Sequence, residues 1–230
     1  PTLSELYATD IAKKNDRLTI GNLDLKPEKN NYFSLSAEYV HERFSVSVNA
    51  FYNNIRDMID YNTIATGDKA MEQYGHKEVR QRDNIAEAKV HGINVSANAY
   101  LGAGFNLSGG YTHLNTQDVE LEQPIDKSIK NAYNINAQWA HSWKIYRLNI
   151  NLNGRINSKR FSKSYGYAPE YQLWDLNTRH SFNLKSVIIE PGFGMENLFD
   201  YMDDRPYNSN YATLTPGRSF YISLSLKFKS

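Results

Sequence analysis

Apolar and polar residues alternate along most of this chain with a period of two. Near the C-terminal end, one set of positions is apolar and the intervening set is polar: Phe220, Ile222, Leu224, Leu226 and Phe228 against Tyr221, Ser223, Ser225 and Lys227. Successive side chains of a β-strand point to opposite faces, so this stretch is predicted to be a strand with one apolar face. Aromatic rings at both ends of that face are typical of a strand that crosses a bilayer, because rings prefer the two membrane–water interfaces.

The same alternation predicts about nine strands in total. The other strands are expected at 32–39, 44–53, 93–100, 105–112, 133–139, 146–153, 174–182 and 187–196. Pro191 lies inside one of them, and proline cannot donate a ladder hydrogen bond, so a bulge is predicted there. The polar face of the pair 133–139 and 146–153 is rich in asparagine, which suits a water-filled lumen or a polar plug better than a packed core.

Short and long connections between the predicted strands alternate strictly. The short ones fall at 41–43, 101–104, 142–144 and 184–185, whereas the long segments, predicted to be irregular, fall at about 1–29, 56–83, 117–128, 158–170 and 199–216. One helical turn is expected near Ser4–Tyr7. Transmembrane barrels have short periplasmic turns and long extracellular loops, so the final strand should end on the periplasmic side. Aromatic residues also fall in two levels, as in the two girdles of an outer-membrane barrel.

Composition narrows the class of protein. The net charge is +1, which does not suggest a nucleic-acid partner, and the absence of cysteine excludes disulfides and thiolate metal sites. No run approaches the roughly 18 apolar residues of a membrane helix. The chain starts at Pro1 without an initiator methionine or signal peptide, so we expect a piece of a longer protein. The predicted fold is all-β: an antiparallel up-and-down transmembrane β-barrel, incomplete in this chain. A soluble β-sandwich binding module shares the alternation but predicts neither the loop asymmetry nor the girdles.

Several motifs resemble those of one family, the TonB-dependent outer-membrane receptors. Their positions are Pro-Thr-Leu-Ser-Glu-Leu-Tyr at 1–7, Gly-Asn-Leu-Asp-Leu-Lys-Pro-Glu at 21–28, Asn-Leu-Phe-Asp at 197–200, Pro-Gly-Arg-Ser-Phe-Tyr at 216–221, and the near-terminal Phe228. The resemblance implies the C-terminal part of a 22-stranded barrel, with a plug domain absent from this chain, in the outer membrane of a Gram-negative bacterium. It also implies import of a scarce metal chelate, a ferric siderophore or haem, driven by TonB through the missing N-terminal part. A cobalamin receptor of the same family is the alternative.

The chain departs from the family's pattern in two places. Haem receptors tend to carry Asn-Pro-Asn/Asp-Leu with a histidine upstream, whereas Leu23 stands here in place of the proline and no histidine occurs in residues 1–29. This weakens the case for an axial haem ligand in that segment. The chain also ends Phe228-Lys229-Ser230 rather than on an aromatic residue.

Tyrosines interleaved with basic residues in the long segments are the candidate ligand contacts. Aromatic faces and fixed positive charge suit an anionic, partly aromatic chelate, although ordinary extracellular loops have the same composition. The candidates are Tyr61, Tyr74, His76, Arg80, Arg82, Arg160, Tyr165, Tyr167, Tyr207 and Tyr211.

Carboxylates and histidines are the other candidates for metal binding or catalysis. Asp118, Glu120, Glu122 and Asp126 could bind calcium through their oxygens, although a solvated loop is the simpler interpretation. An outer-membrane barrel enzyme would need a histidine with a serine or acidic partner. His113, His141 and His180 instead fall in the apolar phase or at strand ends, and no Gly-x-Ser-x-Gly or His-Glu-x-x-His occurs. We therefore expect binding and gating rather than catalysis, with outer-membrane lipid as a partner and no covalently bound cofactor.

Overall fold

The computed structural model describes residues 1–163, 166–203 and 216–229, and the side chains of 85 and 86 lie outside this description. Strands dominate. The elements in chain order are α1 (Leu3–Tyr7), β1 (Thr9–Ala12), β2 (Arg17–Ile20), β3 (Lys29–His41), β4 (Phe44–Thr66), α2 (Gly67–Tyr74), β5 (Glu78–Gly102), β6 (Phe105–Asp118), β7 (Asn131–Trp143), β8 (Tyr146–Asn157), β9 (Arg160–Ser162), β10 (Gly166–Ala168), β11 (Tyr171–Asn183), β12 (Val187–Glu196) and β13 (Ser219–Phe228).

The chain divides into two compact units, which are described separately below. Unit 1 comprises residues 1–33, 52–91 and 116–124, and unit 2 comprises residues 34–51, 92–115 and 125–230. Among the described residues, the two helices are both too short and too polar to cross a membrane.

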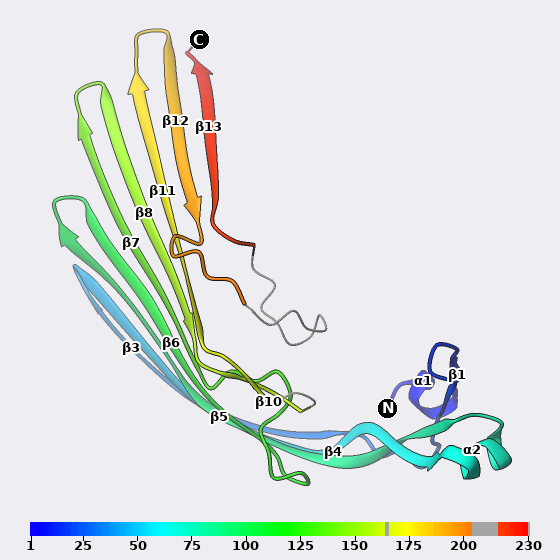
Figure 1. The fold of residues 1–230 in the computed structure, drawn as a ribbon. Helices are drawn as coiled ribbons and strands as arrows, with labels where there is room; N and C mark the ends of the chain where they lie inside the picture. Colours follow the sequence, from blue (N-terminus) through cyan, green and yellow to red (C-terminus); the bar gives the residue numbers. More distant parts are fainter. Residues whose placement is uncertain (164–165, 204–215, 230) are drawn as a thin grey trace. The chain divides into compact units, whose positions relative to one another are not determined.

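Unit 2 is a sheet in which neighbouring strands are neighbours in sequence. Its strands follow the order β5-β6-β7-β8-β11-β12-β13, with β3 paired to β4 and β4 to β5, and they lie side by side in Figure 1. Ile150 lies opposite Trp139 and Thr178, and every paired register from β6 to β13 is antiparallel. The predicted up-and-down sheet is therefore confirmed, and all nine predicted strands occur in it.

The short connections between strands also lie at their predicted positions. Val187 and Phe228 are register partners, and the Lys229 N–H donates to the Ser186 carbonyl at 3.0 Å. The end of β13 therefore lies beside the short β11–β12 connection, as predicted.

The bulge predicted at Pro191 is wrong. Arg179 pairs with Gly192 on one side of the proline and Phe182 pairs with Ile189 on the other, in one unbroken register. Pro191 itself pairs with Leu224 on β13. The β11–β12 pairing is interrupted between Arg179 and Phe182, so the missing proline N–H costs only a local gap in the ladder rather than a shift of register.

Aromatic rings form a row near the short connections of unit 2. The ring centroids are 5.8 Å apart for Phe105–Trp139, 6.1 Å for Trp139–Trp143, 5.4 Å for Trp143–Tyr146 and 5.0 Å for Tyr146–Phe182. A second level, toward the long connections, includes the Tyr111–Tyr133 stack at 4.8 Å and the Phe193–Phe220 pair at 6.2 Å. Between the two levels the apolar face is exposed on β13, where Ile222 is 84% and Leu224 65% accessible.

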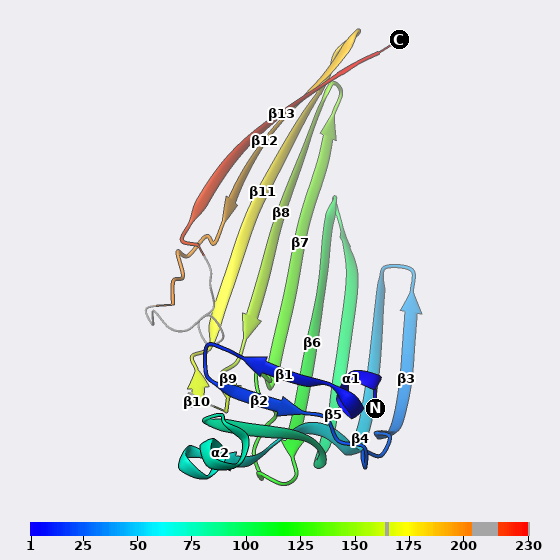
Figure 2. The same cartoon turned by 90° about the vertical axis from the view of Figure 1, so that its right-hand side faces the viewer.

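Unit 1 has a small hydrophobic core. Leu18 of β2, Ala70 of α2 and Val79 of β5 are buried and pack together, and Ile20, Ala65 and Tyr74 cover them. β1 and β2 form an antiparallel hairpin, visible in Figure 2, and β2 pairs with β5 in parallel. At the start of α1, the Thr2 side chain accepts the Glu5 N–H while the Glu5 carboxylate accepts the Thr2 N–H, which satisfies otherwise unpaired donors.

The prediction that 56–83 is irregular is wrong. β4 continues to Thr66, α2 follows directly, and β5 begins at Glu78. The helical turn predicted near Ser4–Tyr7 is confirmed as α1. The segment 1–29 also contains the β1–β2 hairpin, which was not predicted, and 158–170 contains the β9–β10 hairpin. These strands carry polar residues on both faces or are very short, so they lack the period-two signal on which the prediction depended.

Candidate functional site

Tyr61 and Arg82 form the most direct contact between two predicted ligand residues. The Arg82 Cζ lies 3.8 Å from the centroid of the Tyr61 ring, and Arg82 Nη2 donates to the Tyr61 hydroxyl at 2.6 Å. The two residues come from β4 and β5 of unit 1. Tyr61 stays 41% exposed. The pair therefore presents a ring and a guanidinium to solvent in a fixed arrangement, and a cation over a ring is favourable by about 0.5–1 kcal/mol at an exposed site.

Three other predicted residues of unit 1 have structural partners. Tyr74 packs on the core of α2 and β5. Arg80 Nε donates to Glu78 Oε1 at 2.5 Å, so much of its charge is balanced locally. His76 Nδ1 lies 2.9 Å from Asp16 Oδ1, and this contact joins the turn after α2 to the β1–β2 turn.

The Asp16–His76 contact also affects ionisation. The hydrogen bond from His76 is the main cause that holds the pKa of Asp16 below its ordinary value. The Asp16 carbonyl accepts the Lys77 N–H at 3.0 Å. Asp16 is thus bonded through both side chain and backbone to the start of β5, and the role of His76 here is to hold two turns together.

The remaining predicted ligand residues lie in unit 2 or outside the described residues. Arg160 is on β9 and pairs in register with Ala168, while Tyr167 on β10 is 55% exposed and meets Phe161 edge-on at 5.3 Å. Tyr165, Tyr207 and Tyr211 lie outside the described residues.

The four carboxylates proposed for calcium do not form a metal-binding group. Among the described residues, no three histidine, aspartate or glutamate side chains gather as a metal would require. Asp118 Oδ1 accepts the Leu121 N–H at 3.1 Å, and Asp126 Oδ1 accepts the Lys163 N–H at 2.8 Å. Asp118 therefore stabilises its own turn, whereas Asp126 links two segments that are 37 positions apart.

The histidines of unit 2 contact aromatic or amide partners. His141 lies 4.4 Å from the Trp143 ring and 6.0 Å from the Trp139 ring, between centroids. His180 Nδ1 is 2.7 Å from the Tyr146 hydroxyl, and His113 Nδ1 is 2.8 Å from Asn131 Oδ1. Each of these three histidines therefore contacts an aromatic ring, a tyrosine hydroxyl or an amide.

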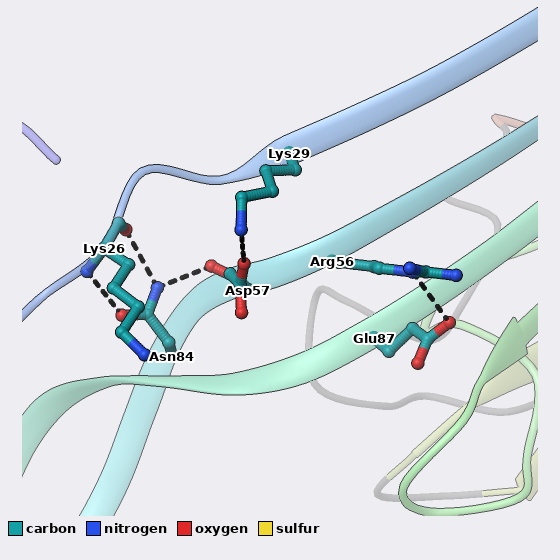
Figure 3. A network of polar contacts seen from close by, with 6 residues as sticks. All are labelled: Lys26, Lys29, Arg56, Asp57, Asn84 and Glu87. Carbon is teal, nitrogen blue, oxygen red and sulfur yellow. Dashed lines mark hydrogen bonds and ion pairs between the residues drawn. The ribbon is translucent and has the colours of Figure 1, made fainter.

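Sequence reasoning missed how the Gly21–Glu28 segment is held. Asn84 of β5 contacts both ends of a backbone unit, accepting the Lys26 N–H at 2.7 Å and donating to the Lys26 carbonyl at 3.0 Å (Figure 3). Asn84 also donates to the carbonyl of Asp57, a residue with a left-handed φ of 56°. Lys29 and Asp57 form an ion pair at 3.0 Å. One amide side chain therefore ties the segment to β4 and β5.

The rest of the segment is fixed in the same way. A Cβ on Gly21 would lie 2.5 Å from the Leu6 carbonyl oxygen, so only glycine allows this approach to α1. Asn22 donates to the Arg82 carbonyl at 3.0 Å, and Glu28 accepts the Ile59 N–H at 2.8 Å. We call residues 21–28 the clamp segment. Because it bonds the backbone of Arg82, it also supports the strand that carries the Tyr61–Arg82 pair.

Comparison with known proteins identifies the family. The family described as "TonB dependent receptor-like, beta-barrel" matches residues 1–198. The chain belongs to the TonB-dependent receptor β-barrel family. The sequence of this chain is 28% identical to that of the probable TonB-dependent siderophore receptor PiuA of Acinetobacter baumannii, over 63% of this chain and 21% of that protein. It therefore spans about a fifth of the length of this curated relative.

Solved structures show the same barrel fold. A variant of the ferric enterobactin receptor PfeA of Pseudomonas aeruginosa is 22% identical and superposes with a TM-score of 0.68, over 92% of this chain and 32% of that chain. The ferric preacinetobactin receptor BauA of Acinetobacter baumannii is 17% identical, with a TM-score of 0.65 over 88% of this chain and 30% of that chain. The copper transporter OprC is 13% identical, with a TM-score of 0.69 over 100% of this chain and 36% of that chain. At these identities the likeness concerns the fold, and the sheet described above is part of a receptor barrel.

Proposed function

We propose that this chain forms part of an outer-membrane receptor that binds a ferric siderophore and imports it with energy delivered by TonB. The family supports the receptor role, and the relative at 28% identity, a probable siderophore receptor, supports the siderophore. The exposed apolar face of unit 2, bounded by two levels of aromatic rings, supports outer-membrane lipid as its surroundings.

The observation that carries the ligand class is the exposed Tyr61–Arg82 pair. A ferric siderophore is commonly anionic and partly aromatic, so a guanidinium and a phenol ring held together offer it charge and a stacking face at once. Arg80 contributes less to this surface because Glu78 already pairs with it. The site is therefore built on one ring and one cation of unit 1 rather than on every basic residue of the long segments.

Haem and cobalamin fit the described residues less well than a ferric siderophore does. Haem ligation needs an available axial side chain, and His76, the histidine nearest the Tyr61–Arg82 pair in sequence, is engaged with Asp16. Cobalamin presents less negative charge, so a guanidinium would contribute little to its recognition. The likeness to a copper transporter at 13% identity shows that the fold alone does not select a ligand.

The function is tested by expressing the full-length receptor in cells that lack their own iron receptors. Ferric enterobactin, haem and cyanocobalamin are offered separately, and surface binding and uptake are measured with and without TonB. We expect saturable binding and TonB-dependent uptake of a ferric chelate. Uptake of cyanocobalamin with no binding of any ferric siderophore would replace the iron proposal with the cobalamin alternative.

A further inference from the structure

Among the described side chains of β4 to β7, the polar face of the sheet carries no ionisable group between the levels of aromatic rings. In a receptor barrel this face borders the lumen. Its members are hydroxyls, amides and one glycine, which we call the neutral wall: Ser45, Ser47, Asn49, Asn94, Ser96, Asn98, Asn106, Ser108, Gly110, Thr112, Asn134, Asn136 and Gln138.

The polar face from β8 to β13 differs sharply. It carries both signs of charge, at Arg147, Arg155, Asp175, Arg179, Glu190, Glu196 and Lys227. Lys227 and Glu190 form an ion pair at 2.6 Å across β12 and β13. We call this part the charged wall. The two walls belong to one sheet in unit 2, so the contrast is a property of the surface and not of separate domains.

Several side chains of the neutral wall form hydrogen bonds with one another or with neighbouring strands. The Ser47 and Ser96 hydroxyls are 2.7 Å apart, and Thr112 donates to Asn94 Oδ1 at 3.0 Å. At the borders of the wall, Asn49 donates to Ser36 and Asn136 donates to Asn153, at 2.7 and 2.6 Å. Neutral side chains that bond one another leave fewer groups that need a protein partner, and such hydrogen bonds exchange readily with water.

The neutral wall is also hollowed. A cavity of about 390 Å³ is lined by Asn98, Asn106, Ser108, Asn136 and Gln138, with His41, Glu42 and Arg43 of the β3–β4 turn at its end. A second cavity of about 370 Å³ includes Gln138 but lies mainly on the charged wall, where Asn151, Asn177, Arg179 and Tyr221 line it. Since the two cavities share Gln138, the hollow runs from the neutral wall onto the charged wall, and only its part over the neutral-wall strands β5 to β7 lacks a lining charge away from the β3–β4 turn.

We propose that the solute imported by the receptor passes along the neutral wall. This inference rests on the proposed function and adds the route within it. Passage requires binding that is weak enough to release, and fixed charges in a lumen either hold or repel an anion strongly. Hydroxyls and amides offer an anionic chelate weak, exchangeable hydrogen bonds instead. The charged wall, by contrast, has the fixed charges that a tightly held protein partner can pair with.

The test places a negative charge on each wall of the full-length receptor. Ser108→Asp lies in the neutral-wall hollow, and Ser225→Asp, opposite Glu190 on the charged wall, is the matched control. Ser108→Ala and Ser225→Ala control for loss of the hydroxyl. The probe is ferric enterobactin carrying radioactive iron, or the ferric complex that the wild-type receptor takes up best. Surface binding is measured in de-energised cells and uptake in energised cells.

We expect Ser108→Asp to slow uptake about tenfold with unchanged surface binding, while Ser225→Asp stays within about twofold of the wild-type receptor. Wild-type uptake by Ser108→Asp, or equal slowing by both variants, overturns the route. A wild-type receptor that binds and imports no ferric complex would instead refute the proposed function, so the two failures are distinguishable.

A second measurement guards against variants that do not assemble. The chain contains no cysteine, so Ser108→Cys and Ser225→Cys each introduce one thiol into it, and a negatively charged thiol reagent then adds charge after assembly. Reaction at Cys-substituted position 108 with loss of uptake supports the route. Failure of that position to react, while position 225 reacts, contradicts it, because a route for a hydrated solute must admit the reagent.

Discussion

Asn84 holds Lys26 entirely through its backbone, accepting the N–H at 2.7 Å and donating to the carbonyl at 3.0 Å. The Asn84 side chain bonds both backbone groups of Lys26, as the backbone of a paired strand would, although the clamp segment is not itself a strand. The identity of residue 26 is therefore unimportant for this contact, whereas the identity of residue 84 is essential.

The first prediction follows from that asymmetry. Asn84→Ala removes three hydrogen bonds, including the one to Asp57, and should lower the free energy of local opening of the clamp segment by about 2 kcal/mol. Lys26→Ala keeps the backbone contacts and should change it by no more than about 0.5 kcal/mol. Amide hydrogen exchange of residues 21–28 in the full-length receptor measures both. Similar opening in the two variants would show that the side chain of Asn84 is not what holds the segment.

The second prediction concerns the two faces of β8. Ile150 lies between Trp139 and Thr178 on the apolar face, while Asn151 lies between Gln138 and Asn177 on the polar face. Ile150→Arg should destabilise the receptor by about 2–4 kcal/mol if that face contacts lipid near mid-bilayer, and Asn151→Arg should be mild. Reversible unfolding in urea with lipid vesicles measures the difference. Equal costs would argue against a lipid-facing apolar surface.

The third prediction concerns pH and the Asp16–His76 contact. The pKa of Asp16 is lowered in the folded state, chiefly by the hydrogen bond from His76, so its carboxylate stabilises the fold above the ordinary aspartate pKa of about 3.9. That contribution should disappear as the pH falls through the lowered folded-state pKa. Hydrogen exchange at Lys77, followed from pH 6 down to about pH 2, should show this acid-dependent opening. In Asp16→Asn the opening should be larger at neutral pH and should lose this part of its pH dependence; an unchanged profile would exclude Asp16 as its source.

The fourth prediction separates two arginines on one strand. Arg82→Ala should weaken binding of a ferric siderophore by about 1 kcal/mol, roughly fivefold, because Arg82 and the Tyr61 ring act together. Arg80→Ala should cost less, since Glu78 already balances that charge. The loss from Arg82→Ala should shrink at high salt, which screens exposed charges.

A double-mutant cycle with Tyr61→Ala provides the control. Coupling between positions 61 and 82 is expected because the two side chains touch, and equilibrium binding to outer-membrane preparations measures it. Two results would argue for a less anionic ligand such as cobalamin. One is a larger loss of binding affinity from Arg80→Ala than from Arg82→Ala. The other is a loss of affinity from Tyr61→Ala while neither arginine substitution changes the affinity.

The sequence predicted unit 2 well because its strands keep one apolar and one polar face, the alternation expected of a receptor barrel between lipid and a watery lumen. That pattern occurs in every strand from 32–39 to 220–228, and Pro191 changes only the local pairing of one ladder. Unit 1 lacks this alternation. The extensions of β4 and β5 are polar on both faces, and β1 and β2 have only four residues each, so neither showed a usable period.

The candidate site could be predicted only as a set of residue types. Tyr61 and Arg82 were both candidates, but nothing in the sequence pairs residues that lie 21 positions apart on two strands. Asp16 and His76 are 60 positions apart, and His76 therefore looked like a ligand contact rather than a link between two turns. No sequence pattern pointed to Asn84. Its side chain bonds the backbone of Lys26 and Asp57, and these residues lie next to Asn84 only in the folded chain.

The most direct test of the central claim is energised uptake by the full-length receptor in cells that lack their other iron receptors. Radioactive iron is supplied as ferric enterobactin and as the ferric complexes of other siderophores, with unlabelled haem and cyanocobalamin as competitors. The account predicts uptake of at least one ferric siderophore that stops when TonB is deleted and is not reduced by either competitor. Surface binding and uptake of none of these ferric complexes, or uptake that continues without TonB, would contradict it.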